Sequence, residues 1–235
     1  VEDLALDELE KLGYSVFKSE SYTSPNKQID AARNKDHTVA ILLTNLDKAL
    51  RRLNPGYEDE IYKEAVRNFI RLADNPNMMI NNHYLHKLLV EGIRIKTSVN
   101  GESRTVTLYA IDFNNVNNNE FIATNQFTFE GRHERRPDVT LFINGLPLVT
   151  FEFKDISNPN VSIHDAYNQF ETYKEEISDY MKYNEILIIS DGINARAGSI
   201  TAGFDRFMRW RAPKNVTDTT ELELVTLIKY MLEPS

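Results

Sequence analysis

The chain has 235 residues, of which 41% are hydrophobic and 10% aromatic, so it can bury one substantial core, and one large α/β domain is the simplest organisation. The absence of cysteine excludes disulfides, thiolate nucleophiles and cysteine-based zinc sites. It leaves oxygen ligands or histidine for any metal, which favours a hard cation such as Mg²⁺. The formal net charge of −8 argues against a free-standing DNA-binding protein. No apolar run is long enough to cross a membrane and no export signal opens the chain, so we expect a soluble, cytoplasmic protein.

Helical patterns dominate the first 92 residues. They predict helices over residues 2–12, about 36–53, about 58–73 and about 77–91, and glycines at the ends of three of these runs are typical stop signals. A last helical pattern covers about 218–233 and has an apolar face that needs a surface to cover it. Because the chain also opens without a methionine, we interpret it as a piece of a larger polypeptide.

Strand patterns cover residues 93–97, 104–113 and 121–130, and the asparagine-rich stretch between the last two suits a polar turn. A β-meander is the natural arrangement of these three strands. Two more strands then flank Asn144-Gly145, a helix opens near Ser162 with Asp165 three residues on, and residues 185–190 form a continuous apolar strand. The resulting order is strand, strand, helix, strand.

Charged residues mark one face of each strand beside Asn144-Gly145. Glu152 and Lys154 lie on the polar face of residues 147–154, and Asp138 lies on the polar face of residues 138–143. A plain two-residue turn would set Asp138 opposite Phe151, on the wrong face, so an odd-length loop or a bulge is required. Asp138 would then lie across from Glu152 or diagonal to it, at roughly 4.5–8 Å between the Cβ atoms, which suits two carboxylates that share one cation.

These three residue types permit phosphodiester hydrolysis. A cation held by Asp138 and Glu152 would polarise the phosphoryl oxygen and acidify a bound water, while Lys154 would position or deprotonate that water and offset the developing charge. On spacing alone, the alternative is a solvated strand face that bears Asp, Glu and Lys by chance. The hydrophobic neighbours of Glu152 favour the catalytic interpretation, because buried carboxylates usually pair or bind metal.

Two further groups could point at the same site. Gln169 and Tyr173 lie four residues apart on the predicted helix and project from one face, although for Tyr173 alone a place in the core is the better interpretation. Arg132, Arg135 and Arg136 directly precede the first carboxylate and could bind phosphates, although a solvated loop explains them equally well.

Together these residues resemble the N-terminal nuclease domain of the restriction subunit of type I restriction-modification enzymes, in the PD-(D/E)xK or RecB-like superfamily. The resemblance rests on RRPDVTLFINGLPLVTFEFK, on Gln169 and Tyr173 in QFETY, and on ISDG. It extends over nearly the whole chain, through LNPGYEDEIY, NNHYLHKLLVEGI, IDFNNVNNNEF, NQFTFEGRHERRPD and GSITAGFDRFMRWR.

The resemblance implies an α/β fold with a restriction-endonuclease-like core, in which a mixed central sheet is flanked by helices and preceded by a helical N-terminal region. It implies one nuclease domain over residues 1–235, mainly helical over about 1–92, with the nuclease core over about 93–210 and the 218–233 helix leading toward a motor domain. Asp138, Glu152 and Lys154 would be catalytic, the first two as ligands of Mg²⁺ or Mn²⁺, with Gln169 and Tyr173 as the accessory motif. An upstream helical glutamate joins the metal site in related nucleases, and Glu8 is the candidate here.

The resemblance also implies partners: double-stranded DNA, modification (methyltransferase) and specificity subunits, and a downstream ATP-driven translocase. ATP binding by this chain itself is not expected, because no G-x-x-x-x-G-K-[ST] motif occurs. Two alternatives stay open, a non-catalytic assembly domain that retains a nuclease fold, and a stand-alone PD-(D/E)xK repair or junction nuclease. The intact set of Asp138, Glu152 and Lys154 argues against the first.

Overall fold

A computed structural model describes residues 1–19, 21, 25–99, 102–155, 161–211 and 221–234. The helices are α1 (Glu2–Lys11), α2 (Lys27–Ala32), α3 (Leu43–Leu53), α4 (Asp59–Ile70), α5 (Met78–Glu91), α6 (Ile163–Glu176), α7 (Ser178–Met181) and α8 (Glu223–Met231), with the 3-10 turns η1 (Arg71–Asp74), η2 (Val116–Asn118) and η3 (Phe204–Arg206). The strands are β1 (Ser15–Phe17), β2 (Ile93–Val99), β3 (Glu102–Leu108), β4 (Phe121–Asn125), β5 (Phe129–Glu130), β6 (Glu134–Arg135), β7 (Val139–Ile143), β8 (Leu146–Phe153), β9 (Ile186–Ser190) and β10 (Ala195–Gly198).

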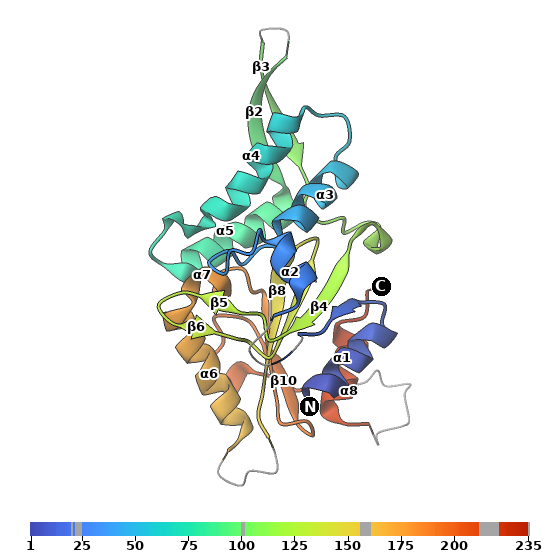
Figure 1. Cartoon of the computed structure of the whole chain (residues 1–235), viewed down its shortest axis with the longest axis vertical. Coiled ribbons are helices and arrows are strands. Elements are labelled where there is room, and N and C mark those ends of the chain that lie inside the picture. Colours follow the sequence, from blue (N-terminus) through green and yellow to red (C-terminus); the bar gives the residue numbers. More distant parts are fainter. Residues whose placement is uncertain (20, 22–24, 100–101, 156–160, 212–220, 235) are drawn as a thin grey trace.

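Six strands form the central sheet, in the order β1-β4-β7-β8-β9-β10. The β1–β4 and β8–β9 pairs are parallel and the other three are antiparallel, so the sheet is mixed, as predicted. Figure 1 shows α6 on one side of the sheet and α1 with α8 on the other. The buried apolar side chains form one continuous cluster that extends from α1 to α8. The sheet therefore has helices over both faces, and its central strands are buried on both sides.

The predicted β-meander is wrong. β3 pairs with β2 in a separate two-stranded ribbon, whereas β4 lies between β1 and β7 in the central sheet. The chain leaves β3 after Leu108 because the next segment folds into a polar loop around Asp112, whose carboxylate accepts the backbone N–H groups of Asn114 and Asn115. β4 itself stops at Asn125, since Gln126 has a left-handed backbone (φ 51°) that a strand does not accommodate.

The predicted helices at 2–12, 58–73 and 77–91 are confirmed within a few residues, but the helix at 36–53 begins only at Leu43. The backbone N–H of Leu42 donates to the carbonyl of Gly145 at 2.9 Å, so a tertiary contact replaces the helical one. The prediction also missed β1 and α2. β1 brings the N-terminal region into the central sheet, beside β4. Among the described residues, no helix is long and apolar enough to cross a membrane.

The β7–β8 hairpin contains the bulge that the sequence requires. Asn144 and Gly145 both have positive φ (50° and 86°), which makes a two-residue turn, and Ile143 pairs with Leu146. The register then shifts between Leu141 and Phe142, so that Val139 pairs with Phe151. Continuing this register by one residue brings Asp138 opposite Glu152.

Candidate active site

The three predicted catalytic residues meet at one end of β7 and β8. Asp138 precedes β7, and its Oδ2 accepts the backbone N–H of Phe153 at 2.7 Å. Glu152 is the second-last residue of β8, and Lys154 directly follows the strand. Lys154 Nζ donates to Glu152 Oε1 at 3.0 Å. The structure thus brings both carboxylates and the lysine together, because the bulge in the β7–β8 hairpin sets the register that places them side by side.

Burial dominates the electrostatics of the two carboxylates. Glu152 is only 5% exposed, and desolvation, reinforced by the charge of Asp138, raises its pKa from 4.5 to about 8. Desolvation also raises the pKa of Asp138 from 3.8 to about 6, while the N–H of Phe153 opposes that rise. Lys154 and Tyr173 oppose this rise in the pKa of Glu152 but offset only part of it. Ionising both acids together is therefore costly, and a bound cation would lower that cost.

Helix α6 supplies Tyr173 to this pair. A capping box between Ser162 and Asp165 starts the helix, as predicted. Tyr173 is 4% exposed, and its hydroxyl donates to Glu152 Oε2 at 3.1 Å, so it belongs both to the core and to the site. Gln169 lies one turn earlier on the same helix and is half-buried.

A third carboxylate, Glu2, borders the site and was missed by sequence reasoning. It is the first residue of α1, and it accepts hydrogen bonds from the side-chain amides of Asn125 and of Gln126, the latter at 2.9 Å. Gln126 also donates its backbone N–H to the carbonyl of Asp138 at 3.1 Å. A cavity of about 390 Å³ opens here, lined by Val1, Glu2, Gln126, Asp138, Phe153, Lys154 and Asp155.

The structure does not bring Glu8 to this cavity. Glu8 pairs with Lys11 at 2.6 Å and lies six residues beyond Glu2, about 9 Å along the helix axis. Glu2, on the same helix, lies at the cavity instead. Gln126 reaches Glu2 from a left-handed backbone conformation. The sequence around Gln126 does not predict that conformation, so it gave no signal for the contact.

Two of the three arginines ahead of Asp138 form ion pairs with glutamates. Arg135 forms an ion pair with Glu176 on α6, and Arg136 pairs with Glu134. Arg132 is exposed, and its backbone N–H donates to the carbonyl of Glu176 at 2.8 Å. The contacts of Arg132 and Arg135 with Glu176 fix the β5–β6 hairpin against α6.

The donor set fits a divalent cation in part. The half-buried Asp138 lines the cavity together with Lys154, whose ammonium donates to the buried Glu152. Carboxylate oxygens of this kind suit Mg²⁺ or Mn²⁺. Within the described ranges, however, no three histidine, aspartate or glutamate side chains stand close enough to form a complete protein-only site. Mg²⁺ commonly keeps several waters and takes only one or two carboxylates, so the pair Asp138 and Glu152 is sufficient in kind.

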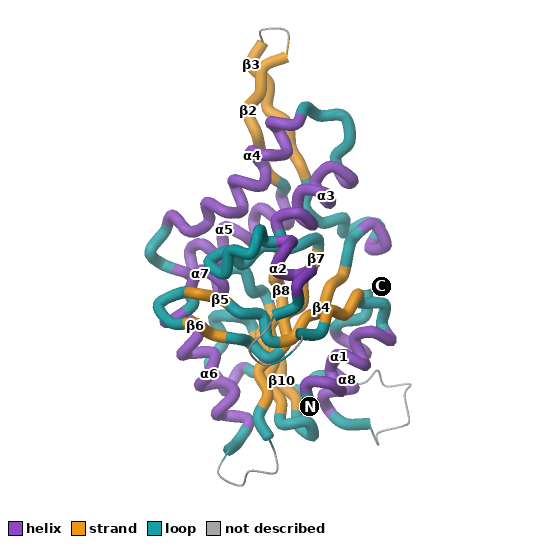
Figure 2. Tube along the Cα trace, viewed as in Figure 1, coloured by secondary structure: helices purple, strands orange, loops and turns teal. Residues whose placement is uncertain are grey.

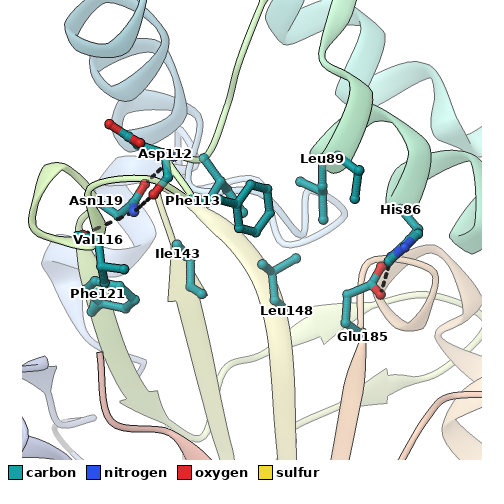
Figure 3. A pocket seen from close by; sticks show the side chains of 12 residues that line it. His86, Leu89, Asp112, Phe113, Val116, Asn119, Phe121, Ile143, Leu148 and Glu185 are labelled. Carbon is teal, nitrogen blue, oxygen red and sulfur yellow. Dashed lines mark hydrogen bonds and ion pairs between the residues drawn. The ribbon is translucent and has the colours of Figure 1, made fainter. Parts of the chain in front are cut away.

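A second cavity, of about 450 Å³, lies at the other ends of β7 and β8 and is mainly apolar (Figure 3). Its two carboxylates are already engaged: Asp112 accepts the N–H groups of its own loop, and Glu185 lies 3.1 Å from His86. It offers no paired acids and no lysine beside an acid. Of these two cavities, only the one beside Asp138 combines carboxylates with a lysine.

A mixed sheet that carries an aspartate on one strand and a Glu-x-Lys on its antiparallel neighbour defines a PD-(D/E)xK-like nuclease core. Residues 1–206 match the family described as type I restriction enzyme R protein N terminus, and the chain belongs to this family.

Several relatives are endonuclease subunits of type I restriction enzymes. The chain is 34% identical over 240 residues to the HindI endonuclease subunit of Haemophilus influenzae, with 100% of the chain and 22% of that protein covered. It is 32% identical over 242 residues to the putative MjaIXP endonuclease subunit of Methanocaldococcus jannaschii, covering 100% of the chain and 23% of that protein. The EcoprrI endonuclease subunit of Escherichia coli is 28% identical over 191 residues, which is 74% of the chain and 56% of that protein. The chain thus spans less than a quarter of the length of the first two relatives.

Proposed function

We propose that this chain is the Mg²⁺-dependent endonuclease domain of a type I restriction enzyme, and that it hydrolyses phosphodiester bonds of double-stranded DNA. It would act in assembly with an ATP-driven translocase and with modification and specificity subunits. The observation that carries the proposal is the bulged β7–β8 hairpin, which sets Asp138 opposite Glu152 with Lys154 bonded to Glu152. The names of the relatives support the restriction role, and their greater length leaves room for the other activities.

The residues would divide the chemistry as follows. Asp138 and Glu152 would hold Mg²⁺ or Mn²⁺, which when bound polarises a phosphoryl oxygen and acidifies water. Lys154 would position the attacking water and offset negative charge that develops on the phosphate. Tyr173 would fix Glu152 through Oε2, which leaves Oε1 to Lys154. Glu2 stands at the rim of the same cavity, where it adds negative charge.

A supercoiled-plasmid nicking assay tests the proposal, with the parent enzyme measured with and without Mg²⁺, ATP and the partner subunits. Lys154→Ala is expected to abolish cleavage while the fold stays intact, because the lysine ends a strand at a half-buried position and contributes little to the core. Lys11→Ala is a matched control, since Lys11 also pairs with a glutamate but lies on the exposed face of α1. Cleavage by Lys154→Ala at a rate near that of the unmodified enzyme would overturn the assignment.

A further inference from the structure

The β2–β3 ribbon extends away from the body of the molecule. Figures 1 and 2 show it beyond α3 and α4, at the opposite end from the N-terminus, which borders the candidate active site. Seven residue pairs join the two strands in an unbroken antiparallel register, from Ile93 with Leu108 to Val99 with Glu102. The ribbon is therefore a regular two-stranded element with two faces of distinct composition.

One face anchors the ribbon to the core. Ile93, Ile95, Val106 and Leu108 are all buried, and β2 packs beside α4. These four residues occupy alternate positions and pair with one another across the strands. They fix the orientation of the opposite face, because the two faces of a ribbon alternate residue by residue.

The opposite face carries only hydrogen-bond donors of the kind that bind phosphate. It is made of three cross-strand pairs, Arg94 with Thr107, Lys96 with Thr105 and Ser98 with Ser103. All of these side chains are exposed except that of Thr107, which is half-buried. Neither strand contributes an acidic residue to this face. Glu58, Glu60 and Glu64 of α4 line a cavity with Arg94 and Lys96, and Glu60 and Glu64 are already paired with Arg67. Among the described residues, neither Arg94 nor Lys96 comes within ion-pair distance of a carboxylate, in a chain whose net charge is −8.

This composition fits nucleic acid better than protein. Protein–protein interfaces are depleted in lysine and serine at their core and need apolar or aromatic anchors, which this face lacks. Contacts to the DNA backbone are made mainly by arginine, lysine, serine and threonine side chains. The face from Arg94 to Ser98 is about 13 Å long at 3.3 Å per residue, so it can meet only a few phosphates of one DNA strand.

We propose that the outer face of the β2–β3 ribbon binds the sugar-phosphate backbone of duplex DNA, outside the segment that is cut. The proposal rests on the proposed function, since it assumes that DNA is the substrate, and it adds a second contact at the far end of the molecule. Two cations release few counterions, so the contact is weak and steers or holds the duplex without reading its sequence.

Binding of the full chain to a short labelled duplex, measured by fluorescence anisotropy over a range of low salt concentrations, tests this proposal. The double variant Arg94→Ala/Lys96→Ala is expected to lower affinity roughly tenfold at the lowest salt and to reduce the slope of log K against log salt by about 2. Arg94→Lys/Lys96→Arg keeps both charges and should bind like the unmodified chain. Lys48→Ala/Lys87→Ala removes the same charge from two exposed positions outside the ribbon, and its slope should stay unchanged.

Three outcomes would overturn the proposal. The first is an unchanged salt slope in the ribbon variant, and the second is an equal loss of affinity in the Lys48 and Lys87 control. The third is unchanged DNA binding together with lost assembly with the partner subunits, which would make the face a protein interface. A loss of fold in the double variant would show as a lowered melting temperature. The single variants Arg94→Ala and Lys96→Ala then decide the question, because each should reduce the slope by about 1. The proposed function is tested separately, by DNA cleavage. A variant that cannot cleave, such as Lys154→Ala, can still bind DNA through the ribbon, and an enzyme whose ribbon does not bind DNA can still cleave it.

Discussion

The pKa of Glu152 is shifted further than that of Asp138, and the titration of both groups makes the stability of the fold depend on pH. Its pKa is raised from 4.5 to about 8 and that of Asp138 from 3.8 to about 6, mainly by burial. The folded chain therefore holds protons that the unfolded chain has already released, and in chelator its stability should fall as pH rises from about 4 to about 8. Thermal melts across this window check the sign. A stability that rises steadily over the same window would contradict it.

Metal binding should show the opposite dependence, because a cation competes with the same protons. Excess Mg²⁺ or Mn²⁺ is expected to raise the melting temperature little below pH 6 and clearly at pH 8, where Asp138 has ionised and Glu152 is about half ionised. Melts with and without the ion at each pH measure the difference. A metal effect of equal size at both pH values would place the ion away from Asp138 and Glu152.

Neutralising either Asp138 or Glu152 distinguishes the effect of their mutual repulsion on stability from the effect of metal binding. Two ionised carboxylates about 6 Å apart repel by roughly 3 kcal/mol at an effective dielectric near 20, and Lys154 offsets part of this. Asp138→Asn and Glu152→Gln keep the side-chain volume and remove this repulsion. In chelator at about pH 9, where both acids are ionised, each variant should be as stable as the unmodified chain or up to about 1 kcal/mol more stable. Neither should respond to Mg²⁺, whereas the control Glu8→Gln should respond normally. If both site variants melt several degrees lower and still respond to metal, these carboxylates are structural.

At the scale of elements, α6 couples the core to the site through Tyr173. Tyr173→Phe removes only the hydrogen bond to Glu152, so cleavage should fall about 10-fold to 100-fold while stability falls by about 1 kcal/mol. Gln169→Ala should also reduce cleavage more than stability, because Gln169 is half-buried on the same helix. Tyr180→Phe is the control, since its buried hydroxyl bonds to Thr140 and Thr150 and does not touch Glu152. Equal losses of cleavage in Tyr173→Phe and Tyr180→Phe would assign Tyr173 to the core alone.

The hairpin shows why much of the site could be predicted from the sequence. Asp138, Glu152 and Lys154 lie within 17 residues of one another, and strand alternation together with the Asn144-Gly145 turn determines whether they share a face. The need for a bulge followed from that parity, and the structure has one. Short-range periodicity was sufficient for these three residues because they lie on one hairpin.

Elements that depend on distant contacts could not be predicted in the same way. Glu2 reaches the site through Gln126, which is 124 residues away in sequence. β1 has only three residues and forms a strand because β4 pairs with it. Alternation in residues 104–113 and 121–130 indicated strands but could not indicate their partners, and the meander was the wrong choice. Local pattern determines the kind of element, whereas long-range pairing determines its place.

At the scale of the whole molecule, charge limits what the chain does alone. With a net charge of −8, and with Arg135 and Arg136 in ion pairs, it offers little attraction to phosphates outside the β2–β3 ribbon. The chain without partners should therefore bind short duplex DNA weakly, with a salt slope no steeper than about 2. Anisotropy titrations measure both quantities. A tight complex with a much steeper salt slope would show that the domain holds DNA by itself.

The packing of α1 also determines the order in which the site is completed during synthesis. α1 contacts α8, and the Tyr14 hydroxyl that follows α1 donates to the carbonyl of Leu232 at 2.8 Å, 218 residues later. A ribosome that adds about 5–20 residues per second needs roughly ten seconds or more to travel from α1 to α8. The carboxylates on β7 and β8 can come together during that interval, but the helix that carries Glu2 gains its last support only when α8 has emerged. α1 is thus made before the strands of the candidate site but is secured after them, so the cavity beside Glu2 is complete only once α8 has left the ribosome.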